Sequence, residues 1–262
     1  LQFPKLHTSE KLYVSDTYLS APKIKIAKFP TIDLSANFLL VTHERLLSSA
    51  IDYKNYRESA QGGGYKVQLI TTEEIYNEFS SGSPDLTAIR DFVKYLYDNS
   101  TSHKIKYLCL FGDASYDFKN RIGGNNNIVP VFEAYESFNL AASYVTDDYF
   151  GMMDSNEGDL SYLNRQDVAT GRIPVSNALE AEQVVTKILN YYSSKSFGDW
   201  NSHITLIADD IDAAGEETLQ INMEKIADTI KERAPLFNLK KIYLDAYKQI
   251  STSGGNKYPT VN

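Results

Sequence analysis

The sequence predicts an α/β protein whose strands form a parallel sheet. The first observation is the apolar run Tyr107–Phe111, which ends at Gly112 and is followed by an acidic turn that reaches Asp117. A short, continuous apolar stretch of this kind is typical of a strand buried on both faces of a parallel sheet. The second is the alternation of strand and helix patterns over residues 37–111, which indicates right-handed crossovers between parallel strands. The third is a similar alternation over residues 203–244.

The first elements follow an extended lead-in. Residues 1–36 are interrupted by three prolines, and we expect a lead-in from a preceding β-rich region with one or two edge strands. Residues 37–42 form the first core strand. A helix is predicted over 44–60, with an inner face that includes Ala50 and Ile51. The glycines of 62–64 end this helix with a flexible turn.

Two helices separate the next two strands. A strand over 65–70 is followed by a short helix that ends at Phe79, capped by Thr71 or Thr72 together with Glu74. A longer helix is predicted to start with Ser83 as its cap and Pro84 at its first position, and to continue to about residue 99. Its inner face has the i, i+3, i+4 spacing of an amphipathic helix: Leu86, Ile89, Phe92, Val93 and Leu96. The central strand then covers residues 105–111.

A long irregular segment follows, at 113–167, and so long a segment inside a compact domain is usually functional. A strand is predicted at 168–174. Asn177 caps the next helix, whose inner stripe is expected to be Leu179, Val184, Ile188 and Tyr191.

A second unit begins near residue 203. It has a strand at 203–208, an acidic turn at 209–212, a helix at about 216–234 and a strand at 239–244. Residues 251–262 are predicted to be irregular. These patterns divide the chain into a lead-in over 1–36, a first α/β subdomain over 37–198, and the start of a second subdomain over 199–262.

Composition and charge exclude several classes of protein. The chain has 262 residues, 42% of them hydrophobic, which is enough for a core. Its net charge of −8 and its lack of dense Lys and Arg runs argue against a nucleic-acid partner. No apolar stretch approaches about 20 residues, so direct membrane insertion is not expected. There is no Walker A loop, no GxSxG elbow and no GxGxxG after a strand, which disfavours phosphate binding and serine-hydrolase chemistry.

The cysteine and histidines do not form a recognisable site. Cys109 is the single cysteine, so no internal disulfide is possible. It lies within the apolar central strand, and we interpret it as a buried core residue and not as a nucleophile. The four histidines are widely spaced and do not match a zinc site. They are His7, His43, His103 and His203.

Acidic residues gather in the loops that follow strands. Asp113 and Asp117 mark the carboxyl end of the central strand, where ligands and catalytic groups collect in open α/β sheets. Residues 154–159 resemble a fragment of a calcium loop, although the distal Glu of an EF-hand has no counterpart. Turn formation without a metal is the alternative interpretation. The candidate calcium ligands are Asp147, Asp148, Asp154 and Asp159.

Four segments together resemble the gingipain-type cysteine peptidase family (peptidase C25). The resemblance covers about residues 36–262. Within the family the segments are most similar to sortase-like members of the type IX secretion system of Bacteroidetes. The segments are Ile75–Phe79, Leu110–Asp117, Ser143–Gly151, and Gly171–Pro174 with the helix that follows.

The resemblance implies a three-layer, caspase-like fold of two subdomains, the second only begun in these residues. It implies a His/Cys dyad in which His lies in a His-Gly turn and Cys ends the next core strand. Both would lie after Asn262, so this fragment alone is expected to be inactive, and Cys109 does not match the nucleophile. Asp210 or Asp212 falls where the family places an acid near the dyad. Structural calcium is implied, and no other cofactor is required.

The implied partners are a protein substrate with a carboxy-terminal sorting signal and other proteins of the secretion system. The implied location is the bacterial cell surface, in association with the outer membrane. Two other functions remain open. One is a non-catalytic interaction or scaffold domain of the type IX secretion machinery. The other is a free-standing ligand-binding α/β domain.

Overall fold

A computed structural model describes residues 29–100, 105–124, 127–134, 138–139, 142–160 and 164–261. The chain divides into two compact units, residues 1–183 and 184–262. Most of the predicted lead-in, residues 1–28, lies outside the described residues. In the part of the chain that the structure describes, no helix is long and apolar enough to span a bilayer.

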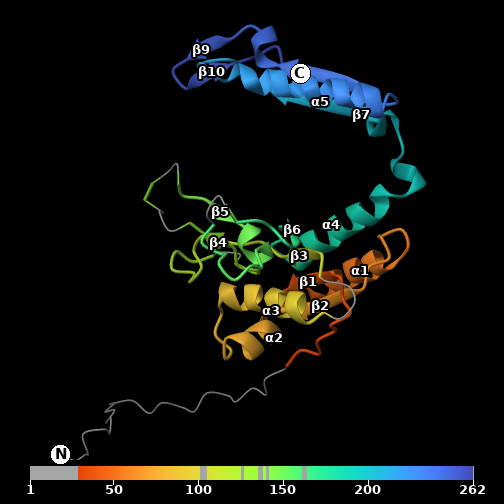
Figure 1. Cartoon of the computed structure of the whole chain (residues 1–262), viewed down its shortest axis with the longest axis vertical. Coiled ribbons are helices and arrows are strands. Elements are labelled where there is room, and N and C mark those ends of the chain that lie inside the picture. The colour runs from red at the N-terminus through yellow and green to blue at the C-terminus, as the bar shows by residue number, and fades with distance from the viewer. Residues whose placement is uncertain are drawn as a thin grey trace, which may run out of the picture. The chain divides into compact units, whose positions relative to one another are not determined.

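The first unit is built on a four-stranded parallel sheet (Figure 1). Its strands are β1 (Phe38–Thr42), β2 (Val67–Thr71), β3 (Tyr107–Phe111) and β6 (Ala169–Ile173), in the order β2-β1-β3-β6. Phe38 pairs with Val67 and Tyr107, and Tyr107 pairs with Ala169, so the four strands are level. Their carboxyl ends therefore lie along one edge. The predicted parallel sheet is confirmed.

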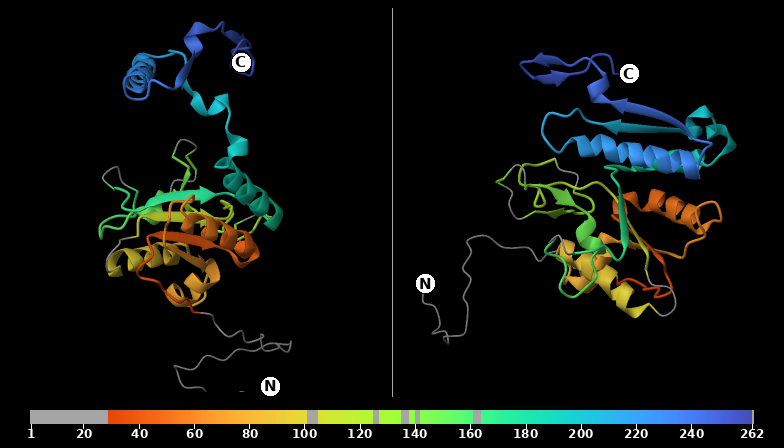
Figure 2. Two further views of the ribbon diagram at one scale, coloured as in Figure 1. Left: turned by 90° about the vertical axis from the view of Figure 1, so that its right-hand side faces the viewer. Right: turned by 45° about the horizontal axis from the view of Figure 1, so that its top comes forward.

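Helices cover both faces of this sheet. From β1 the chain crosses in one direction through α1 (Leu47–Glu58) to β2. It returns in the other direction through α2 (Thr72–Phe79) and α3 (Leu86–Asn99) to β3. Crossovers of one hand that run in opposite directions place their helices on opposite faces. Figure 2 shows the resulting three layers of the first unit.

The core of the first unit comes from the apolar strands and the inner helix faces. Leu39, Leu40, Val41 and Leu110 are fully buried. On the α1 face, the Tyr53 ring stacks on Phe111 with 6.2 Å between centroids. On the α3 face, the predicted residues Ile89, Phe92, Val93 and Leu96 are all buried.

Helix boundaries and faces differ from the predictions in three places. A 3-10 turn, Glu44–Leu46, precedes α1, and Ile51 is exposed while Ala50 and Tyr53 face the core. The cap of α3 is Asp85, which accepts a hydrogen bond from the Thr87 N–H, and not Ser83. An aspartate one residue before the helix offers its carboxylate to the orphan N–H groups more directly. The capping box of α2, in contrast, agrees with the prediction and is formed by Thr71 and Glu74.

The inner face of α4 (Ala178–Tyr191) was also predicted wrongly. Ala181 and Val185 are buried, whereas Leu179 and Tyr191 are largely exposed. A stripe chosen by side-chain size misses a small residue such as alanine, which allows close approach of the helix.

The irregular segment between β3 and β6 contains short elements. β4 (Phe132–Glu133) and β5 (Val145–Thr146) form an antiparallel ribbon. A 3-10 turn, Asp148–Gly151, follows it. Helix α3 contacts this turn, so the segment is held to the body of the unit.

The second unit contains β7 (His203–Ala208) and β8 (Asn238–Tyr243), which pair in parallel, and α5 (Glu217–Arg233) between them. Two 3-10 turns, Ser194–Ser196 and Asp199–Ser202, precede β7, and a third, Leu244–Ala246, follows β8. The carboxylate of Glu224 on α5 accepts hydrogen bonds from Lys241 Nζ and Tyr243 OH on β8. The terminal residues are not irregular as predicted, because β9 (Ile250–Thr252) and β10 (Gly255–Lys257) form a hairpin.

Candidate functional site

The chain turns sharply at the carboxyl end of β3, where Gly112 has a φ of +153°. A Cβ atom there would lie 2.9 Å from side-chain methyl carbons of Ile128 and Val129. A larger residue at this position would therefore collide with the segment that packs above it. The Asp113 N–H donates to the Val175 carbonyl at 2.9 Å, which ties the turn to the residues after β6.

The two acids of the predicted rim both have structural partners. Asp113 accepts hydrogen bonds from the Ala114 N–H at 2.9 Å and the Ser176 hydroxyl at 3.0 Å. Asp117 accepts from the N–H groups of Arg121 and Ile122, each at 2.8 Å, and these bonds lower the pKa of its carboxyl. Asp117 thus closes its own turn, which agrees with the alternative of turn formation.

Arg172, on β6, holds the loops at this edge together. Its guanidinium forms a bidentate ion pair with Asp147, at 2.7 and 2.8 Å. It also donates to the carbonyls of Gly112 and Val129 at 2.8 and 2.7 Å, and to that of Pro130 at 3.0 Å. These bonds use all five guanidinium N–H groups, and the side chain is only 12% exposed. The role of Arg172 was missed in the sequence, where only the acidic residue at 147 suggested a cation nearby.

A cavity of about 590 Å³ opens between the β3 turn and β5. Its walls combine the carboxylates of Asp113 and Asp147 with apolar side chains. The lining also includes Ala114, Ser115, Tyr116, Val131, Val145, Thr146 and Arg172. This cavity lies at the carboxyl edge of the sheet, where ligands bind in open α/β folds.

The four predicted calcium ligands are not gathered into one group. Both oxygens of Asp147 are engaged by Arg172, and Asp148 accepts from the Gln166 side chain at 2.9 Å. Among the described residues, no three His, Cys, Asp or Glu side chains are arranged to hold a metal ion. Calcium in these loops stays a prediction.

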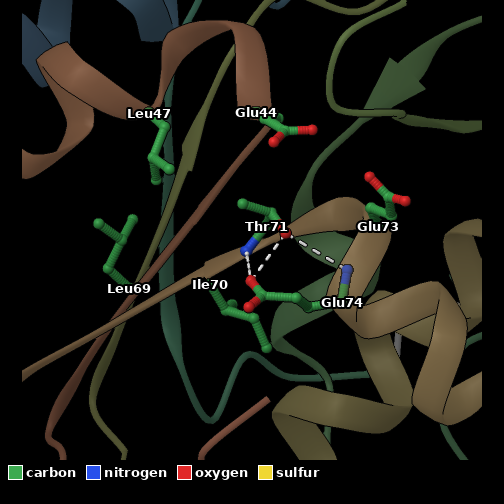
Figure 3. A pocket seen from close by; sticks show the side chains of 7 residues that line it. All are labelled: Glu44, Leu47, Leu69, Ile70, Thr71, Glu73 and Glu74. Atoms are coloured by element: carbon green, nitrogen blue, oxygen red, sulfur yellow. Dashed lines mark hydrogen bonds between the residues drawn. The ribbon is translucent and has the colours of Figure 1, made fainter. Parts of the chain in front are cut away.

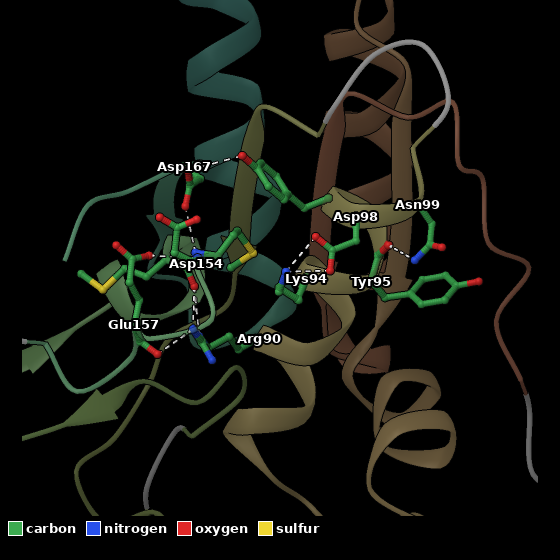
Figure 4. A network of polar contacts seen from close by, with 11 residues as sticks. Arg90, Lys94, Tyr95, Asp98, Asn99, Asp154, Glu157 and Asp167 are labelled. Atoms are coloured by element: carbon green, nitrogen blue, oxygen red, sulfur yellow. Dashed lines mark hydrogen bonds and ion pairs between the residues drawn. The ribbon is translucent and has the colours of Figure 1, made fainter.

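The loop of Asp154 and Asp159 already surrounds a cationic side chain. The Arg90 guanidinium donates to the Met152 carbonyl at 2.8 and 3.1 Å and to the Glu157 carbonyl at 3.0 Å (Figure 4). Carbonyl oxygens of this kind are the ligands that a calcium loop offers to its ion. These two carbonyls are therefore occupied, and an ion would need other oxygens.

Cys109 is buried in β3, as predicted. Burial raises the pKa of its thiol to about 12, so the thiolate is scarce near neutral pH. His43 caps the 3-10 turn before α1 by accepting from the Arg45 N–H, and its pKa is lowered by desolvation. His203 is exposed beside the Asp199 carbonyl. His7 and His103 lie outside the described residues.

A small pocket of about 200 Å³ lies at the carboxyl end of β2, lined also by Glu44 and Leu47 (Figure 3). Its floor is apolar, and its polar side is the capping box of Thr71 and Glu74. Glu74 is occupied by the cap, and the other carboxylates that line this pocket are those of Glu44 and Glu73.

The acidic turn of the second unit follows β7. Asp210 accepts a hydrogen bond from Gln249 Nε2 at 2.8 Å, and the same nitrogen lies 2.7 Å from the Tyr258 hydroxyl. A hydrogen bond from Tyr258 lowers the pKa of Asp210. Desolvation, followed by this hydrogen bond, raises the pKa of Tyr258 to about 12. The charge of Asp210 in turn raises the pKa of Asp212, which is exposed. The two predicted acids therefore lie close together, but the pKa of Asp210 is lowered by its hydrogen-bond partner and that of Asp212 is raised by the neighbouring charge.

Comparisons with known proteins agree with this arrangement. The model of peptidase family C25 matches residues 31–262. The crystal structure of dimeric latent PorU from Porphyromonas gingivalis is similar, with a TM-score of 0.52 and 31% sequence identity. The similar region covers 63% of this chain and 16% of the PorU chain, so the chain corresponds to a minor part of that protein. No curated protein sequence matches.

Proposed function

The chain belongs to peptidase family C25, and from this premise we propose that it forms the amino-terminal part of a gingipain-type cysteine peptidase domain. The family match over residues 31–262 carries the proposal, and the 31% identity with PorU supports it. The whole protein would act on secreted proteins as an endopeptidase or a sortase-like transpeptidase. In either case the first step is attack of a thiolate on a peptide carbonyl, with imidazole as base and acid.

We propose that the nucleophile lies outside these 262 residues. Cys109 is the only cysteine, and its buried thiol with a pKa of about 12 is poorly suited to attack a substrate. The 262-residue chain alone is then inactive. Backbone N–H groups would stabilise the oxyanion in the complete domain.

Asp210 is the better candidate for the supporting acid. Gln249 donates a hydrogen bond that holds its carboxylate in place, and the hydrogen bond from Tyr258 lowers its pKa, so it is ionised at neutral pH. An ionised, oriented carboxylate can fix the tautomer of a histidine and stabilise the imidazolium that forms. Asp212 has a raised pKa and no comparable anchor for its carboxylate among the hydrogen bonds described for this turn.

The remaining parts of the proposal rest on the family resemblance. The substrates would be proteins with a carboxy-terminal sorting signal, and the partners would be other proteins of the type IX secretion system. The location would be the cell surface, in association with the outer membrane. Calcium would bind in the acidic loops, with Asp148, Asp154 and Asp159 as candidate ligands.

The test compares this chain with the full-length gene product. Both are incubated with a fluorogenic peptide and, separately, with a peptide carrying a sorting signal and an amine acceptor. We expect hydrolysis or transfer by the full-length protein only, with loss of activity after alkylation by iodoacetamide. Hydrolysis by the 262-residue chain that disappears in Cys109→Ala would contradict the proposal. An inactive full-length protein that still binds its substrates would favour the scaffold function.

A further inference from the structure

The short ribbon of β4 and β5 has a backbone edge with no partner strand among the residues that the structure describes. Ala134 N–H donates to the Tyr144 carbonyl at 3.0 Å, so these two residues form a hydrogen-bonded pair. Glu133 and Val145 are the next pair in the register. Bonded and non-bonded pairs alternate along an antiparallel ladder, so the N–H and C=O of Val145 point away from β4.

The outward edge of Val145 has no partner within the described parts of the chain. No hydrogen bond to its N–H or C=O is present among the described residues. Its side chain is 56% exposed and lines the 590 Å³ cavity described above. Tyr116, on the same lining, is 70% exposed. An apolar wall beside an unpaired strand edge is the arrangement that receives an added strand.

The charged groups of the cavity already have partners. Arg172 and Asp147 neutralise one another, with the guanidinium saturated by its five bonds. Each oxygen of Asp113 accepts one hydrogen bond. The cavity therefore favours an apolar side chain over a charged one, which would lose hydration without gaining a partner.

We propose that the outer edge of β5 and this cavity bind an extended segment of a protein substrate, which pairs with Val145 and places an apolar side chain in the cavity. In an antiparallel pair, the residue opposite Val145 has its side chain on the same face as the Val145 side chain, which lines the cavity. This inference rests on the proposed function, because an extended peptide is the ligand class of a peptidase. A second copy of the chain fits less well, since two-residue strands bury too little area for a stable dimer.

The probe is the peptide acetyl-Thr-Ser-Phe-Ser-Thr-amide, titrated into the 262-residue chain while amide NMR signals of Ser115, Val145 and Thr146 are followed. Saturable shifts with a dissociation constant of about 1 mM or below are expected. A peptide with Asp in place of Phe should bind at least about tenfold more weakly, because the cavity offers no free cation. Methylation of the Phe nitrogen should have a similar effect, because it removes the hydrogen bond to Val145 without altering the protein.

Three variants test the same surface from the side of the protein. Val145→Pro removes the outward N–H but no bond to β4, and Ala114→Phe fills the cavity; both should weaken binding at least about tenfold. Glu133→Pro is the matched control. The N–H of Glu133 points outward from the β4 edge, on the other side of the ribbon, so this variant should bind the peptide as the unmodified chain does. Unchanged NMR signals outside residues 113–147 show that each variant is folded.

Several results would overturn the inference. They are the absence of saturable shifts at about ten times the expected dissociation constant, equal binding of the N-methylated peptide, or equal binding of the Asp peptide. Self-association that Val145→Pro abolishes would assign the edge to a second copy instead. None of these readouts depends on activity, so the peptidase proposal and the peptide-site proposal can fail separately.

Discussion

The two units of the molecule each end a parallel strand in an acidic turn, and the two turns are built differently. After β3, Asp113 is half-buried and tied to the residues that follow β6. After β7, Asp210 and Asp212 lie close enough for the charge of one to raise the pKa of the other. Acidic turns of similar sequence thus form a hydrogen-bonded framework in one unit and a pair of interacting carboxylates in the other.

The comparison indicates where chemistry is available. A carboxylate whose hydrogen bonds are filled by its own fold contributes to structure, whereas interacting carboxylates with shifted pKa values are candidates for a functional role. The first turn is also held by a guanidinium, that of Arg172. None of the hydrogen bonds described for the second turn comes from an arginine. Three predictions test this distinction.

Arg172→Met should have the largest effect. It leaves the half-buried Asp147 carboxylate without its cation and removes donors from three carbonyls, so we expect a loss of about 3 kcal/mol in unfolding free energy. Urea unfolding of the chain measures it. Arg172→Lys, which keeps the charge but not the planar fork, should lose less. If Arg172→Met costs under about 1 kcal/mol, the first turn is not held by this network.

Gly112→Ala should have an intermediate effect. The added Cβ meets methyl carbons of Ile128 and Val129 at 2.9 Å, and a loss of about 2 kcal/mol is expected from the same measurement. Gly171→Ala is the matched control on the neighbouring strand, because nothing lies within 4 Å of its added Cβ. Equal effects of the two substitutions would show that crowding at Gly112 is not what shapes the turn.

Tyr258→Phe should have the smallest effect, confined to the second turn. Loss of the hydroxyl removes the main cause of the lowered pKa of Asp210, so the pKa of Asp210 should rise toward its usual value. As pH falls, the variant should then protonate Asp210 at a higher pH than the unmodified chain does. Carboxyl ¹³C NMR titration measures this, with Tyr247→Phe as control. A titration unchanged by Tyr258→Phe would mean that Asp210 is not held by this hydroxyl.

Much of the fold could be predicted because its signals are local. The apolar run Tyr107–Phe111 ended by Gly112 identified β3, and the i, i+3, i+4 spacing identified the buried face of α3. The family resemblance, carried by motifs such as Gly171–Pro174, was confirmed by the match to peptidase C25. The predictions failed where size or spacing was ambiguous, as for Leu179 in α4 and for the cap at Ser83.

The sequence alone was enough to predict the main strands and helices of both units, the acidic turns that follow β3 and β7, and the burial of Cys109, because each depends on residues close together in the chain. The partners of those residues depend on the three-dimensional fold. Arg172 meets Asp147 across 25 positions, and Asp210 meets Gln249 across 39. Such contacts depend on how sheets and loops bring distant segments together, so the spacing of residues along the chain does not predict them.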